Sequence, residues 1–116
     1  MRNFAIALAT VLAVLFAAPI SARPMLTHQV NVTVTNGACA LQNTSVSRRN
    51  TTILFHVINN GSVAHDFTIW GVRSGFIRPH QEGRFLVNFR TPGRYAYACM
   101  TQNGVFKKGT FTIRNS

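Results

Sequence analysis

The stretch PGRYAYACMTQNGVFKKGTFTI, residues 92–113, decides the fold. Successive side chains of a β-strand point to opposite faces of its sheet, so alternating residues share a face. In the first half of the stretch, small alanines alternate with Tyr95, Tyr97 and Cys99. In the second half, two apolar residues alternate with threonines in the same way. The pattern predicts two strands joined by a polar loop at residues 100–109, with a cysteine near the end of the first strand.

The rest of the chain repeats this organisation. Five further segments have strand patterns: residues 28–35, 43–47, 51–58, 65–70 and 84–89. The 51–58 segment is apolar on both faces, which is typical of a central strand, whereas 43–47 fits a short edge strand. Turn signals rich in asparagine, glycine and proline separate the segments. No amphipathic helix pattern follows residue 22. We therefore predict an all-β, Greek-key β-sandwich of seven to eight strands.

Residues 1–22 have the pattern of a secretory signal peptide. Arg2 precedes an apolar run over residues 4–18, and small residues lead to Ala22. The run is short for a membrane span, which needs about 20 residues, although an uncleaved anchor is the alternative. We predict cleavage after Ala22, one domain over residues 23–116, and a periplasmic or secreted location.

The predicted mature chain is strongly basic. Without Arg2, the chain has eleven basic residues and only two acidic ones, Asp66 and Glu82, which gives a net charge of +9. The basic residues are dispersed, and an exported protein rarely meets nucleic acid, so we expect no nucleic-acid partner. The charge favours an acidic protein partner or an anionic membrane surface, and we expect a monomer. With only two acids, paired-carboxylate catalysis and oxygen-rich calcium sites are excluded.

The chain contains two cysteines, Cys39 and Cys99. In an oxidising compartment such a pair is a disulfide candidate. The alternative is a pair of free thiolates that binds a soft metal ion.

An immunoglobulin-like domain is one β-sandwich reading of these residues. Cys39, Trp70 and the Tyr97–Cys99 spacing resemble its cysteine, tryptophan and Tyr-x-Cys markers. The order of elements argues against it, because Cys39 falls in a predicted loop and the whole 51–58 strand intervenes before Trp70.

A second family resembles the chain over nearly its whole mature length. The run at 59–67, NNGSVAHDF, resembles the segment of cupredoxins in which the first copper histidine opens a strand. The run at 91–99 resembles the strand that carries the copper cysteine, and 108–113 resembles the closing strand. The resemblance implies a cupredoxin-like sandwich in which His65 and Cys99 lie at the metal end.

The resemblance is not to a complete blue-copper centre. Such a centre needs two histidines, a thiolate and a weak axial ligand, often Met, and cupredoxins supply the second histidine and the Met from the loop after the cysteine. Residues 100–109 contain no histidine, and the sole Met there, Met100, directly follows Cys99. The extra Cys39 makes the chain similar to the EfeO-type cupredoxin-like domain of periplasmic iron-uptake proteins.

That similarity implies periplasmic handling of a copper or iron ion through His65, Cys99 and Cys39, without catalysis. Thiolates favour Cu(I) over Fe(III). The alternative is a metal-free binding module, stapled by a Cys39–Cys99 disulfide, that docks to an acidic partner or an anionic envelope surface. We expect His80 to be solvated in its loop and His56 to be a hydrogen-bonded core residue.

Overall fold

The computed structural model describes residues 27–49 and 52–115. The predicted signal peptide lies outside these residues. Within them, no helix is long and apolar enough to cross a membrane.

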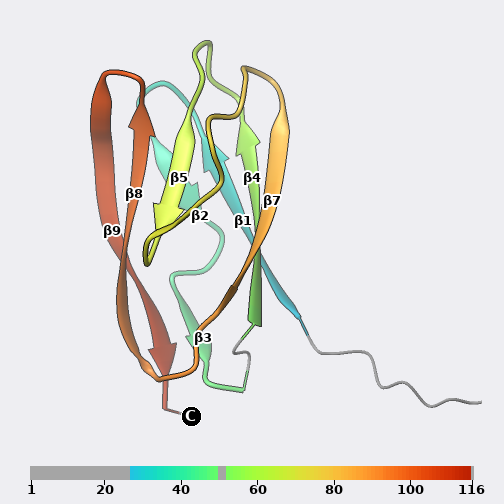
Figure 1. The fold of residues 1–116 in the computed structure, drawn as a ribbon, viewed down its shortest axis with the longest axis vertical. Helices are drawn as coiled ribbons and strands as arrows, with labels where there is room; N and C mark the ends of the chain where they lie inside the picture. Colours follow the sequence, from blue (N-terminus) through green and yellow to red (C-terminus); the bar gives the residue numbers. More distant parts are fainter. Residues whose placement is uncertain (1–26, 50–51, 116) are drawn as a thin grey trace, which may run out of the picture.

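Two sheets face each other and enclose the core (Figure 1). The four-stranded sheet has the order β2 (Cys39–Leu41), β1 (His28–Val34), β4 (Thr52–Asn59) and β7 (Glu82–Asn88). The five-stranded sheet has the order β3 (Ser45–Ser47), β9 (Gly104–Arg114), β8 (Gly93–Thr101), β5 (Asp66–Ile69) and β6 (Val72–Arg73). The predicted all-β sandwich is confirmed.

The described residues form nine strands rather than seven or eight, because two short strands carry weak sequence signals. Cys39 was expected in a loop but opens β2, which pairs with β1. The expected 71–83 loop contains β6, which pairs with β5 across a two-residue turn. Trp70 and Gly71 form this turn with φ angles of 49° and 77°. Two positive φ values match the tight hairpin turn that fits strand twist, although tryptophan is an unusual residue there.

The expected polar loop at 100–109 is mostly strand. β8 continues to Thr101 and β9 begins at Gly104, so two residues, Gln102 and Asn103, make the turn. The ladder register shifts between Cys99 and Met100. The strand that carries the cysteine is therefore followed by a tight hairpin, and not by a loop long enough to fold back over one end of the sandwich.

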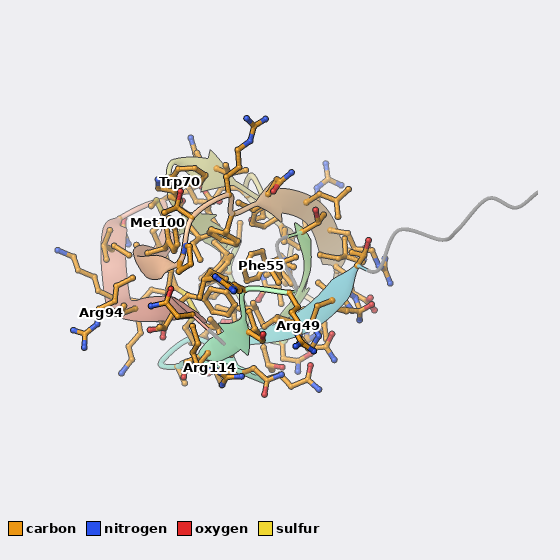
Figure 2. The ribbon with its side chains drawn as sticks, turned by 90° about the horizontal axis from the view of Figure 1, so that it is seen from below. Arg49, Phe55, Trp70, Arg94, Met100 and Arg114 are labelled. Atoms are coloured by element: carbon orange, nitrogen blue, oxygen red, sulfur yellow. A yellow bond between two sulfur atoms is a disulfide. The ribbon has the colours of Figure 1, made fainter. Side chains whose placement is uncertain are left out.

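β4 lies in the middle of its sheet, parallel to β1 and antiparallel to β7. Its inward residues are fully buried, whereas the outward ones are half-buried. The strand is thus central, as predicted, but only one of its faces belongs to the core. Phe55 lies at the centre of the molecule (Figure 2) and contacts the rings of Phe67, Phe85, Phe89 and Phe111.

Two aromatic residues close the core near the start of β8. The Tyr95 hydroxyl donates a hydrogen bond to the Thr91 carbonyl, which is the contact of a tyrosine corner. Trp70 is 54% exposed and packs against Phe89 and Tyr95. Its role is therefore packing at the rim.

Candidate functional site

A disulfide joins Cys39 and Cys99. Cys39 opens β2 in one sheet and Cys99 lies near the end of β8 in the other, so the bond links the two sheets. Their Cα atoms lie 6.4 Å apart, within the range that a disulfide spans. Both residues are buried, at 7% and 0% exposure. The predicted disulfide is confirmed.

The disulfide changes what this end of the sandwich can bind. Soft metal ions are held by thiolate sulfur, and two sulfurs bonded to each other offer no thiolate. The predicted metal set of His65, Cys99 and Cys39 is therefore available only after reduction. Within residues 27–49 and 52–115, no group of three His, Cys, Asp or Glu side chains could hold a metal ion. The side chains in this structure do not fit a blue-copper centre.

His65 lies at the same end, directly before β5. It is fully buried, and its backbone forms a two-bond bridge with Ile77. Its ring packs edge-on against Phe106 of β9, with centroids 5.4 Å apart. His65 is therefore the last residue of the β4–β5 connection, and its ring contacts the β8–β9 hairpin.

Asn59 fixes the His65 ring. The Asn59 amide nitrogen donates to the carbonyl oxygens of Val63 and Ile77, at 2.9 and 2.8 Å. Its Oδ1 accepts from the Gly61 backbone N–H at 2.8 Å and lies 3.1 Å from His65 Nδ1. All four hydrogen-bonding positions of a fully buried amide are thus used.

This geometry determines the tautomer of His65. Carbonyl oxygens only accept, so the amide nitrogen of Asn59 must face Val63 and Ile77, and Oδ1 must face His65. Nδ1 of His65 therefore carries the proton, and in the neutral ring Nε2 carries the lone pair. Nε2 is buried and has no hydrogen-bond partner. A buried polar atom without a partner is uncommon and costly, so this nitrogen is the least satisfied group at this end.

Asp66 follows His65 in sequence but belongs to a different cluster. Its carboxylate accepts from Arg73 Nε at 2.7 Å, and Arg73 Nη2 contacts the same oxygen. The Ser74 hydroxyl donates to the other oxygen at 3.2 Å. Asp66 is fully buried, whereas the Arg73 side chain is 54% exposed. The Asp66 carboxylate therefore neutralises Arg73 and does not orient His65, so the two adjacent residues form no acid–base pair.

The structure separates the other histidines from His65 Nε2. His80 is exposed, has a φ of 62°, and lines a shallow polar hollow at the same end with Asn36, Gly61 and Ser62. His56 is half-buried on the outer face of β4, where Nε2 contacts Glu82. The core position expected for His56 is therefore wrong, because its side chain points away from the neighbouring Phe55.

Both acidic residues contact cations. Glu82 contacts His56 and lies 3.6 Å from Arg84, and Asp66 is held by Arg73. The described residues include ten lysines and arginines, so most of these cations have no carboxylate partner. The basic surface predicted from composition is therefore a real feature of this fold.

The sequence did not identify Asn59 as part of the site. It was assigned to a turn, because asparagines followed by glycine usually mark turns. The two carbonyl groups that accept from its side chain lie 4 and 18 residues away, and its ring partner is six residues away. An asparagine that ends an apolar strand and precedes a histidine by six residues was the available signal.

Comparison with known proteins agrees with this geometry. A family model described as a cupredoxin-like domain matches residues 5–113. A search of curated proteins finds no match.

Solved structures with the same fold include auracyanin B, at 19% identity and a TM-score of 0.57, over 81% of this chain and 92% of that protein. A multicopper oxidase matches at 13% identity and a TM-score of 0.55, over 97% of this chain but 49% of that protein. A multicopper oxidase from Campylobacter jejuni, a metallo-oxidase, matches at 14% identity and a TM-score of 0.52, over 99% of this chain and 36% of that protein. This chain thus spans half or less of the oxidases and most of auracyanin B, and the likeness concerns the fold.

Proposed function

Because this chain belongs to the cupredoxin-like domain family, we propose that it is an exported, non-enzymatic binding module whose oxidised form works without a metal ion. The observation that carries the proposal is the disulfide between Cys39 and Cys99. Cys99 stands where the family resemblance places the copper thiolate, and the bond removes that ligand. The proposed location is the periplasm or the extracellular space, where such a bond persists.

The partner is expected to be anionic. Both acidic groups are engaged by cations, and the exposed arginines and lysines leave a large positive excess. Such a field speeds association with acidic partners or anionic envelope surfaces. A catalytic role is disfavoured, because a nucleophilic cysteine needs a free thiol and an oriented base, whereas Cys99 is bonded and Asp66 faces Arg73.

A second candidate function is metal handling by the reduced protein. The observation that favours it is His65 Nε2, a buried lone pair without a partner at the same end of the sandwich as the cysteines. Reduction would release two thiolates at the same end of the sandwich as this imidazole. Two sulfurs and one nitrogen form a soft donor set, which favours Cu(I) over Fe(III).

Thiol trapping followed by copper titration separates the two functions. The protein is recovered as exported and alkylated with a mass tag, with and without reductant. Tagging of both cysteines only after reduction supports the stapled module, whereas free thiols in the exported protein overturn it. The oxidised and reduced forms are then titrated with Cu(I) against a chromogenic chelator.

Metal handling predicts that the reduced form competes for one Cu(I) and that His65→Ala weakens this competition at least tenfold. His80→Ala is the matched control, since His80 is an exposed histidine at the same end of the sandwich. A reduced protein that does not compete, or a loss equal in both variants, contradicts metal handling and leaves the binding module.

A further inference from the structure

Five arginines lie at the end of the sandwich opposite His65; this group is called the arginine end. Its members are Arg48 and Arg49 after β3, Arg90 in the β7–β8 turn, Arg94 at the start of β8, and Arg114 at the end of β9. All five are exposed. They come from three segments of the chain, which is why they do not form a basic run in the sequence.

Strand register brings these segments together. Ser47 pairs with Arg114, and the Arg48 N–H donates to the Arg114 carbonyl at 2.9 Å. Arg94 lies opposite Thr112 on the adjacent strand. Seen from this end, Arg49, Arg94 and Arg114 lie on the same side of Phe55, below it in the view (Figure 2).

No acidic side chain of the described residues lies at the arginine end. Asp66 opens β5 and Glu82 opens β7, and both strands begin at the opposite end (Figure 1). Among the described residues, the one hydrogen bond that a guanidinium group of these arginines makes joins Arg114 to the Ser45 hydroxyl, at 3.2 Å. The arginine end therefore carries five positive charges that no carboxylate of the described chain neutralises.

We propose that the arginine end docks on the surface of a membrane that contains anionic phospholipids. The planar guanidinium group forms paired hydrogen bonds with phosphate oxygens. For clustered arginines, the free energy of binding to anionic lipid head groups grows roughly in proportion to their number. None of the three segments contributes a large apolar side chain that is exposed; the exposed Trp70 lies at their rim, against Phe89 and Tyr95. A protein partner would favour aromatic or apolar anchors at the centre of its interface, whereas a lipid surface needs only the charge.

The chain path supports the same occupant. β1 begins with His28, paired with Ile53 near the start of β4, so residues 1–26 join the domain at the arginine end. The predicted apolar run at 4–18 belongs to that segment. An apolar run of this kind, held in a bilayer before cleavage, would be joined to the domain through the arginine end. Docking there leaves the opposite end of the sandwich, where His80 is exposed, facing away from the membrane.

This inference deepens the proposed binding module by naming its partner. The test is co-sedimentation of the exported protein with vesicles of phosphatidylcholine alone or with about one third phosphatidylglycerol. The wild type is expected to bind only the anionic vesicles, and to be released as added salt shortens the Debye length. Each arginine removed is expected to weaken binding about fivefold, so the triple variant Arg49→Gln, Arg90→Gln, Arg94→Gln loses about 100-fold.

The matched control removes three charges elsewhere. Arg78, Lys107 and Lys108 are exposed and lie away from the arginine end, and changing all three to glutamine should weaken binding less than tenfold. Equal losses in both triple variants would show an effect of net charge alone and overturn the assignment. Absence of vesicle binding, with charge-dependent binding to polyglutamate instead, would identify an acidic protein as the partner and also overturn it. The thiol-trapping result is independent of these outcomes, so the two proposals fail separately.

Discussion

His65 Nδ1 and Asn59 Oδ1 lie 3.1 Å apart in a region where neither side chain reaches solvent. The bond is one of four that the Asn59 side chain makes, and the other three end on backbone groups of Gly61, Val63 and Ile77. Asn59 thus holds the β4–β5 connection against the segment that follows β6, and orients the ring as well.

The first prediction concerns this amide. Asn59→Ala should lower the free energy of unfolding by about 3 kcal/mol, because it leaves two carbonyls, one N–H and one imidazole without a partner in a buried place. Urea unfolding of the oxidised protein measures the change. The control is Asn60→Ala, since Asn60 is exposed and only its backbone N–H is used, donating to Val34. A similar loss in both variants would contradict the role assigned to Asn59.

The second prediction concerns the disulfide. Cys39 and Cys99 are 60 residues apart, so in the chain-entropy model the bond stabilises the domain by roughly 4 kcal/mol. Reduction should therefore shift the urea midpoint strongly downward. The double variant Cys39→Ala, Cys99→Ala should unfold near the reduced midpoint and should not respond to reductant. The contrary result is a wild-type urea midpoint that does not change although both thiols are shown to be free after reduction. It would show that the disulfide does not stabilise the domain.

The chain's two acids offer a third, matched comparison. Asp66 is fully buried under Arg73, whereas the Glu82 side chain is 50% exposed. Asp66→Asn should cost about 2 kcal/mol, because the buried NH2 of the new amide would face the donors of Arg73 or Ser74 and find no acceptor there. Glu82→Gln should cost less than about 1 kcal/mol, as is typical of exposed ion pairs. Thermal or urea unfolding of both variants decides this, and equal effects would show that burial of Asp66 is not the controlling difference.

The sequence predicted those features that depend on local alternation. The pattern at Tyr95, Tyr97 and Cys99 was sufficient to assign β8, because the two-residue period of a strand is visible within a few residues. The assignment of His65 to a metal site came from family resemblance and stays a prediction; the structure places the residue, fully buried, directly before β5. The Cys39–Cys99 pair followed from export and cysteine count, with the disulfide and the free thiols both left open.

Features that depend on distant segments could not be predicted in this way. Asn59 was assigned to a turn because a glycine follows it closely. Its partners Val63 and Ile77 come from the β4–β5 connection and from the segment after β6, and only folding brings them to it. The arginine end cannot be recognised in the sequence, because its arginines come from three separate segments that only strand pairing brings together. The same holds for the contact between Tyr97 and Gly109, which lie opposite each other on β8 and β9.

That last pair gives the fourth prediction. A Cβ atom added at Gly109 would overlap the Cζ and Oη atoms of the Tyr97 ring, which lies across the glycine. Gly109→Ala should therefore destabilise the protein by about 2 kcal/mol, because the ring must leave its packed position. Gly37→Ala is the control, since its added Cβ meets nothing within 4 Å. It should be neutral, or stabilising by a few tenths of a kcal/mol through the unfolded state.

A double-mutant cycle shows whether the clash is the cause. Tyr97→Ala alone should destabilise the protein, because the ring packs against Phe67 with centroids 5.7 Å apart. In that background, Gly109→Ala should cost much less than it does in the wild type, since the atoms that it overlaps are gone. If instead the two losses simply add, the glycine is required for a reason other than the Tyr97 ring, and the steric explanation of this position is wrong.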